Sequence, residues 1–225
     1  MRKRFPLIDQ IRGFAIVLMI IFHFFYDLKV FGYNNINFSR DFFWFELPRV
    51  IVFLFLLAMG LSLPLIHSEK VNWKKFWPRW IKIALGALAI SIYTYFMFKS
   101  SWVYFGTLHC IALASLVSLP FIRIPRISAI IGLILISLKL FFNITLPWLE
   151  LSHASMDYIP LFPWIGCVFM GFGLWSLGFH QLNPFKSKLF LPLEKMGQHS
   201  LLIYIIHQPI LYGAVYLFTY FFKNS

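Results

Sequence analysis

Long apolar runs alternate with short polar gaps along the whole chain. Seven runs have about the length that a helix needs to cross a bilayer. They cover roughly residues 8–28, 42–66, 80–98, 104–122, 127–144, 158–178 and 199–221. Each is predicted to be helical, because a backbone in lipid must satisfy its hydrogen bonds within its own segment. The pattern therefore predicts an all-α, polytopic integral membrane helix bundle of about seven transmembrane helices, with residues 1–225 forming a single transmembrane domain.

The composition supports a membrane protein. The 225 residues are 60% hydrophobic and only 12% charged, whereas a soluble domain carries about a quarter charged residues. The net charge is +12, but its lysines and arginines cluster between the apolar runs, which favours topology signals and lipid contact over a nucleic-acid partner. Cys110 and Cys167 lie inside apolar runs, which indicates buried thiols. We expect no metal site.

Basic residues cluster before the first run and in every second gap between the runs that follow. They are Arg2, Lys3 and Arg4; Lys70, Lys74, Lys75 and Arg79; Arg123 and Arg126; and Lys186, Lys188 and Lys195. The other gaps are poorer in basic residues and hold Asp27, Asp41, Glu150 and Asp157. By the positive-inside rule, the N-terminus is cytoplasmic and the C-terminus extracytoplasmic. We expect a multi-pass protein of the cell (inner or plasma) membrane, with a short interfacial helix within 181–196.

The first run carries a stripe of charge, in the segment "DQIRGFAIVLMIIFHFFYDL". Arg12 and His23 are eleven residues apart, which on a helix places them within about 20° of one face and about 16 Å apart along the axis. Asp9 precedes Arg12 by three residues and Asp27 follows His23 by four, and both spacings bring side chains together. Such groups face protein or water, so they indicate a functional site. The alternative is a headgroup anchor at Arg12 with a structural histidine at His23.

Two further histidines are predicted at a similar depth. His109 lies near the start of the fourth run, and His207, followed by Gln208, lies in the middle to outer part of the seventh. Together with His23 they are expected to form one pocket in the outer half of the membrane.

The spacing from Arg12 to His23 resembles the arginine–ten residues–histidine motif of membrane acyltransferases that modify cell-surface polysaccharides. The ending "GQHSLLIYIIHQPIL" is similar to their last core helix. More closely, the chain resembles bacterial members of the heparan-alpha-glucosaminide N-acetyltransferase catalytic-domain family. The other matching segments are "FLFLLAMGLSL", "GTLHCIALASL" and "DYIPLFPWIGCVFMGFGL". The resemblance implies transfer of an acyl group, typically acetyl from acetyl-CoA, to an acceptor across the membrane, here a sugar, amino sugar or glycan.

Acyl transfer needs a base and a group that stabilises the tetrahedral oxyanion. His23 is the predicted base, Asp27 orients its ring, and His207 with Gln208 donates to the oxyanion; Arg12 completes the catalytic set. An acetyl-histidine intermediate on His23 is the alternative route, and the sequence does not choose between the two.

The predicted donor site for acyl-CoA is basic. Lys74, Lys75 and Arg79, in the loop "HSEKVNWKKFWPRWIK", together with Arg12, are expected to hold the CoA phosphates. A basic, tryptophan-rich interface anchor is the alternative reading of that loop.

The acceptor is expected to contact Asp157, His109 and Gln208, although Asp157 also suits the start of a helix. Two other functions stay open on the same residues, a small-molecule transporter and a haem-binding electron carrier. The sequence allows a homodimer and does not set the oligomeric state.

Overall fold

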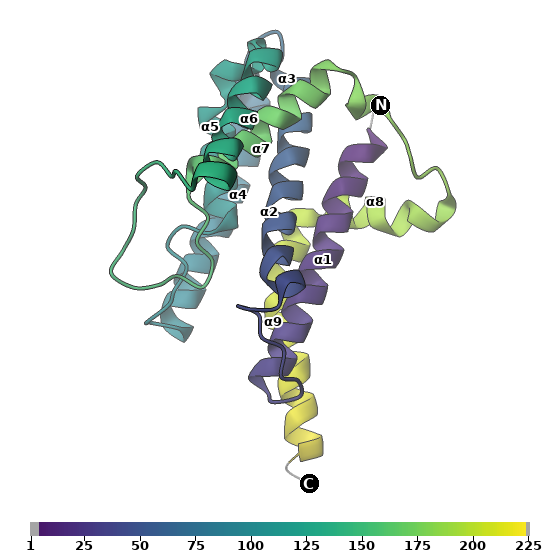
Figure 1. Cartoon of the computed structure of the whole chain (residues 1–225). Helices are drawn as coiled ribbons and strands as arrows, with labels where there is room; N and C mark the ends of the chain where they lie inside the picture. The colour runs from purple at the N-terminus through teal and green to yellow at the C-terminus, as the bar shows by residue number, and fades with distance from the viewer. Residues whose placement is uncertain (1–4, 224–225) are drawn as a thin grey trace. The chain divides into compact units, whose positions relative to one another are not determined.

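The computed structural model describes residues 5–223, and its regular elements there are all helices (Figure 1). The α-helices are α1 (Pro6–Val30), α2 (Phe42–Ser62), α3 (Pro64–His67), α4 (Trp73–Met97), α5 (Thr107–Val117), α6 (Pro125–Phe142), α7 (Leu161–Ser176), α8 (Leu191–Gln198) and α9 (Ser200–Lys223). Short 3₁₀ turns cover Leu119–Arg123, Phe179–Gln181 and Lys188–Phe190. The all-α prediction is confirmed. The basic cluster Arg2, Lys3 and Arg4 lies outside the described residues.

Five helical segments in the described part of the chain are long and apolar enough to cross a membrane. They are Pro6–Val30, Phe42–His67, Trp73–Met97, Pro125–Phe142 and Ser200–Phe222. Two shorter apolar helices, Thr107–Val117 and Leu161–Ser176, fall on the fourth and sixth predicted runs. A multi-pass membrane protein is therefore supported, while the count of seven spans and the direction of the termini stay predictions.

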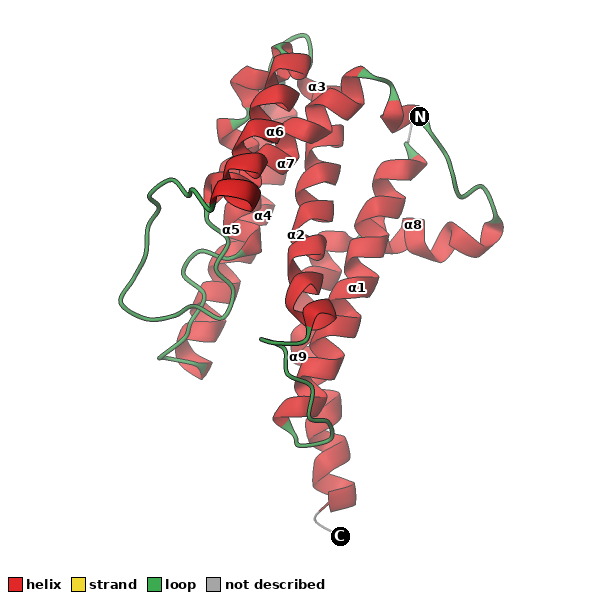
Figure 2. Ribbon diagram, in the orientation of Figure 1, coloured by secondary structure: helices red, strands yellow, loops and turns green. Residues whose placement is uncertain are grey.

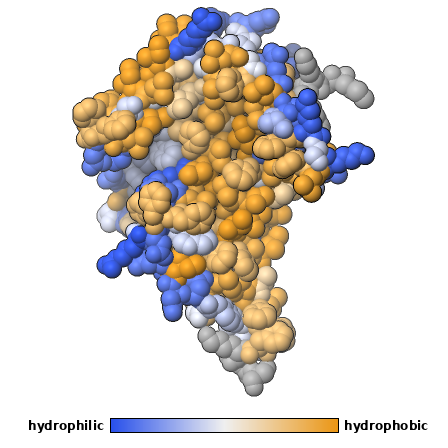
Figure 3. Space-filling view, turned by 45° about the vertical axis from the view of Figure 1, so that its right-hand side comes forward, coloured by the Kyte–Doolittle hydropathy of each residue, from blue (hydrophilic) through white to orange (hydrophobic). Residues whose placement is uncertain are grey.

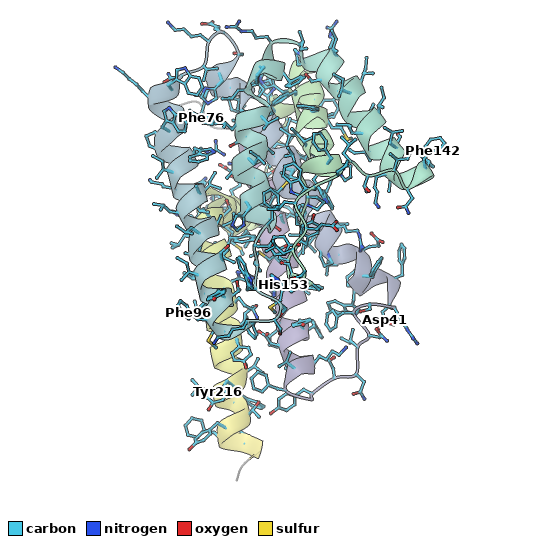
Figure 4. The ribbon with its side chains drawn as sticks, turned by 90° about the vertical axis from the view of Figure 1, so that its left-hand side faces the viewer. Asp41, Phe76, Phe96, Phe142, His153 and Tyr216 are labelled. Carbon is cyan, nitrogen blue, oxygen red and sulfur yellow. The ribbon has the colours of Figure 1, made fainter. Side chains whose placement is uncertain are left out.

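One face of the molecule is largely apolar in the space-filling view (Figure 3). Phe96 on α4, Phe142 on α6 and Tyr216 on α9 are 72%, 69% and 52% exposed and lie on the outside of the ribbon (Figure 4). Soluble proteins rarely leave so many large apolar side chains uncovered. Lipid is the environment that such a surface suits.

The chain forms two compact units. Within the described residues, the first contains 5–8 and Leu56–Pro184, and the second contains Asp9–Phe55 and 185–223. The first unit therefore holds α3 to α7 with the end of α2, and its core includes the fully buried Leu56, Val168 and Phe172. Between α6 and α7, residues 143–160 form a long loop without helix (Figure 2). The prediction of one domain over the whole chain is not tested by this division.

The second unit is built on α1 from Asp9 onward, the first part of α2 (42–55), α9 and the short α8. Helices α1 and α9 run side by side, and α8 lies crosswise to α1 (Figure 1). Two glycines allow the crossing: a Cβ on Gly13 would lie 2.0 Å from the Leu193 carbonyl oxygen, and one on Gly197 would lie 1.8 Å from that of Asp9. A short helix is found where the sequence predicted one within 181–196: α8 begins at Leu191 and ends at Gln198, and its interfacial position stays a prediction.

Candidate active site

The second unit brings two of the predicted histidines into contact. His23 on α1 and His207 on α9 have ring centroids 4.8 Å apart, with the ring planes at 63°. Nδ1 of His207 lies 2.7 Å from the carbonyl oxygen of Tyr204. Because a carbonyl oxygen can only accept, Nδ1 carries the hydrogen in this contact. A neutral His207 therefore has a lone pair on Nε2.

Beside the rings, a carboxylate and an amide join the same two helices. Gln208 donates from Nε2 to Oδ1 of Asp27 over 2.8 Å, and Asp27 is only 1% exposed. The sequence predicted that Asp27 would orient the ring of His23. In the structure, the Asp27 carboxylate instead accepts a hydrogen bond from Gln208, and no hydrogen bond joins Asp27 to His23 among the described residues. The physical reason is that the Gln208 amide is fixed within reach by the α1–α9 packing.

Each of these four side chains keeps a buried polar atom with no hydrogen-bond partner in the described part of the chain. The atoms are His23 Nδ1, Asp27 Oδ2, His207 Nε2 and Gln208 Oε1. Buried polar atoms are almost always paired in folded proteins, so four exceptions in one place require an explanation. Asp27 Oδ2, Gln208 Oε1 and, when His207 is neutral, His207 Nε2 are hydrogen-bond acceptors. These three atoms suit a ligand that brings hydroxyl or amine hydrogens.

At the other end of α1, Arg12 lies near Asp9 on the same helix. Arg12 Nη1 and Asp9 Oδ1 are 3.9 Å apart, and the two side chains are 18% and 17% exposed. The three-residue spacing thus brings these side chains together, as the sequence predicted. The neighbouring Gln10 donates to Glu194 Oε1 over 2.8 Å and to the Phe185 carbonyl oxygen over 3.2 Å. The charged end of the stripe is therefore built into the crossing of α1 and α8.

His109 lies in the first unit, where its ring forms hydrogen bonds with nearby residues. Its Nδ1 accepts from the Gly106 N–H over 3.2 Å, and its Nε2 lies 3.1 Å from the Ser91 hydroxyl. The Ser91 hydroxyl in turn donates to the Val103 carbonyl oxygen over 2.6 Å. Of the three histidines predicted to share a pocket, the structure brings His23 and His207 together and gives His109 partners within the other unit.

Asp157 also lies in the first unit, at the start of α5. Its carboxylate accepts from the Thr107 N–H over 2.8 Å and from the Thr107 hydroxyl over 3.3 Å. Burial raises the pKa of the Asp157 carboxyl, and these two hydrogen bonds oppose that shift. Asp157 therefore caps the start of α5, whereas the alternative reading from the sequence placed it at the start of its own following helix, which begins at Leu161. Substrate contact by Asp157 or His109 stays a prediction.

The basic residues predicted to bind the donor lie on a helix rather than in a loop. Helix α4 begins at Trp73, because the Asn72 side chain accepts from the Lys75 N–H over 3.2 Å and caps it. Lys74, Lys75 and Arg79 are exposed and form no ion pair with an acidic side chain in residues 5–223. The prediction of a loop was wrong, because the Asn72 side chain caps a helix that already begins at Trp73.

Lys75 and Arg79 line a small cavity of about 20 Å³, enough for a water molecule. Its wall also holds His67, Trp80 and Ser115 among apolar side chains, and no acidic residue. His67 was not predicted, although its place just before the basic segment could have suggested it. Its Nδ1 accepts from the Asn72 N–H over 3.1 Å. In residues 5–223 no group of three or more His, Cys, Asp or Glu side chains could hold a metal ion.

The fold and the histidine pair define a multi-pass membrane protein with a polar site inside its helices. The sequence profile of the family described as "Heparan-alpha-glucosaminide N-acetyltransferase, catalytic" matches residues 4–209. The chain therefore belongs to this family, which confirms the resemblance and identifies an acetyltransferase-type catalytic domain. Comparison with curated proteins and with solved structures gave no match. A bacterial origin stays a prediction.

Proposed function

We propose that the protein moves an acetyl group from cytoplasmic acetyl-CoA to a sugar, amino sugar or glycan outside the cell membrane. The observation that carries this proposal is the pair His23–His207, packed beside Asp27–Gln208 with four buried polar atoms left unpartnered. The N-terminus is cytoplasmic, the C-terminus extracytoplasmic, and the two short apolar helices complete seven spans.

His23 acts as the base in the direct route. It takes the proton from the acceptor hydroxyl or amine while that atom attacks the thioester carbonyl carbon. When the tetrahedral intermediate collapses, the carbon–sulfur bond breaks, and the proton passes to the CoA thiolate that leaves. In the two-step route, an imidazole nitrogen takes the acetyl group first and the acceptor removes it.

His207 has a more specific role than the sequence allowed. With Nδ1–H bound to the Tyr204 carbonyl, Nε2 accepts when the ring is neutral and donates only when the ring is protonated. An oxyanion at this place therefore needs His207 as an imidazolium, or His207 serves as a second base beside His23. Gln208 holds Asp27, and the free oxygens of both receive the hydrogens of the acceptor.

Lys75 and Arg79, with Lys74 beside them, bind the phosphates of CoA. Their support is a cavity wall without acidic residues and the absence of ion-pair partners in the described residues. Cations without a carboxylate partner remain available to phosphate oxygens, for which Arg offers two parallel donors. Arg12 belongs to the catalytic set at the α8 end of α1.

The contact between the two rings weighs against the haem alternative. Axial histidines of a haem lie on opposite faces of the macrocycle. Rings that touch at a centroid distance of 4.8 Å leave no space for a porphyrin between them.

The test uses the full chain in lipid nanodiscs with labelled acetyl-CoA and a panel of amino sugars and glycans. Label should pass to at least one acceptor, and His23→Ala should lower turnover by roughly 10²–10⁴-fold, the usual effect of losing a general base. Mass spectrometry without acceptor separates the routes, because only the two-step route leaves acetyl on a histidine.

A matched variant at His199, which is exposed and outside the site, serves as the control. His199→Ala should keep wild-type turnover. Equal turnover for His23→Ala and wild type, at equal folded amounts, would refute the assignment of the base.

A further inference from the structure

The segment before and within α8 combines exposed apolar side chains with exposed cations. Phe185, Leu189 and Leu191 are 44%, 78% and 49% exposed. Lys186, Lys188 and Lys195 are exposed in the same stretch. We call these six residues the α8 surface. A helical segment with apolar and basic side chains side by side is typical of elements that lie in a membrane interface.

The lysines of the α8 surface have no acidic partner in the described part of the chain. The two ion pairs found there join Arg12 to Asp9 and Arg49 to Glu46. Glu194, which precedes Lys195 in the chain, accepts a hydrogen bond from Gln10. Three cations are therefore left to an anionic partner from outside the chain.

The direction of α8 fits the same position. Helix α1 is a candidate membrane span, and α8 crosses it near its N-terminal end, lying crosswise to it in the ribbon (Figure 1). A helix that crosses the end of a spanning helix lies along the membrane surface at the level of the headgroups. Its leucines then reach acyl chains while its lysines meet phosphates.

We propose that the α8 surface is a binding site for anionic lipid headgroups, and that bound lipid holds α8 against the first turns of α1. The contacts that would transmit this effect are tight. Gly197 and Gly13 let the backbones meet at Asp9 and Leu193, and Gln10 bonds to Glu194. Lipid binding at the α8 surface therefore stabilises the turn of α1 that carries Arg12.

The test titrates the full chain in detergent with phosphatidylglycerol or phosphatidylcholine and counts bound lipids by native mass spectrometry. Phosphatidylglycerol should bind more tightly. Each lysine near a charged surface contributes about fivefold in affinity, so Lys186→Gln/Lys188→Gln/Lys195→Gln should weaken phosphatidylglycerol binding by about 100-fold. If the triple variant does not fold, each single variant should still show its fivefold loss.

The matched control is Arg40→Gln/Lys99→Gln/Lys139→Gln, which removes the same charge from other elements and should retain binding. Equal losses in both triple variants would overturn the proposal, because they would mean a general charge effect. Displacement of the lipid by equimolar inorganic phosphate or CoA would also overturn it, since the surface would then take soluble phosphates.

A second readout follows the transmission to α1. Phosphatidylglycerol should slow hydrogen exchange at residues 9–13 in the wild type and not in the lysine triple variant. Unchanged exchange with lipid bound would overturn the link between α8 and α1. Neither measurement uses acyl transfer, so failure of the proposed enzyme activity leaves this inference separately testable.

Discussion

Replacing Gly197 by alanine tests the crossing that supports the charged end of the site. The new Cβ would lie 1.8 Å from the carbonyl oxygen of Asp9, whereas real Cβ contacts are practically never below 3.0 Å. The obstacle is backbone, so α8 and α1 must separate by at least about 1.2 Å. That shift stretches the 2.8 Å bond from Gln10 to Glu194 beyond hydrogen-bonding range.

The expected cost follows from three effects. Overpacking of this kind costs about 1–3 kcal/mol, and the lost hydrogen bond costs about 1 kcal/mol. The better helix propensity of alanine returns up to about 1 kcal/mol. The net destabilisation is about 1–3 kcal/mol, which corresponds to a fall in Tm of roughly 2–12 °C for a chain of this size.

The assay heats the detergent-purified protein and measures the folded fraction by size-exclusion chromatography, with acetyl transfer recorded on the same samples. Gly213→Ala is the matched control, because Gly213 is also helical and a Cβ there meets no atom within 4 Å. Its Tm should stay the same or rise slightly. If Gly197→Ala and Gly213→Ala melt together, the close approach of α8 to α1 is wrong.

Three other predictions address the charge, the donor site and the topology. Arg12→Ala should cut acetyl transfer strongly in nanodiscs, and Arg12→Lys should keep part of it only if a point charge suffices; full activity in Arg12→Ala would leave a headgroup anchor. Lys75→Gln/Arg79→Gln should raise the KM for acetyl-CoA about tenfold or more, as expected for two charge-assisted bonds, with kcat changed less; an unchanged KM moves the donor site elsewhere. A C-terminal alkaline phosphatase fusion should be active, because seven spans from a cytoplasmic N-terminus end outside; activity of a C-terminal cytoplasmic reporter instead would show that a span was miscounted.

Much of the fold could be predicted because bilayer thickness imposes a length on each apolar run. The runs 8–28, 42–66 and 199–221 fall on α1, on α2 with α3, and on α9. The start of α4 was missed, since its basic first turns have no apolar pattern and only the cap at Asn72 marks it. Helix boundaries set by one capping side chain are not visible in hydropathy.

The residues of the candidate site were easier to predict from the sequence than the hydrogen bonds between them. The spacing of Arg12 and His23 identified one face of α1, and the sequence also selected His207 and Gln208. Which partner Asp27 takes depends on how α1 packs against α9, and residue spacing along one helix does not predict that packing. His109 shows a related limit, because a predicted depth does not identify hydrogen-bond partners, and the structure pairs this ring with Gly106 and Ser91.

The polar groups along α1 divide into two sets with different physical roles. Near its start, Asp9, Gln10 and Arg12 have partners on α1 itself or on α8, so their polarity supports structure in addition to the catalytic part that we propose for Arg12. Near its end, His23 and Asp27 each keep a buried polar atom without a partner among the described residues. Polar groups that are expensive in a membrane but left unpaired add nothing to stability, which favours a chemical role for them. Substitutions at the first end should therefore change stability and activity together, whereas His23→Ala should change activity alone; a change at Asp27 also breaks its hydrogen bond to Gln208.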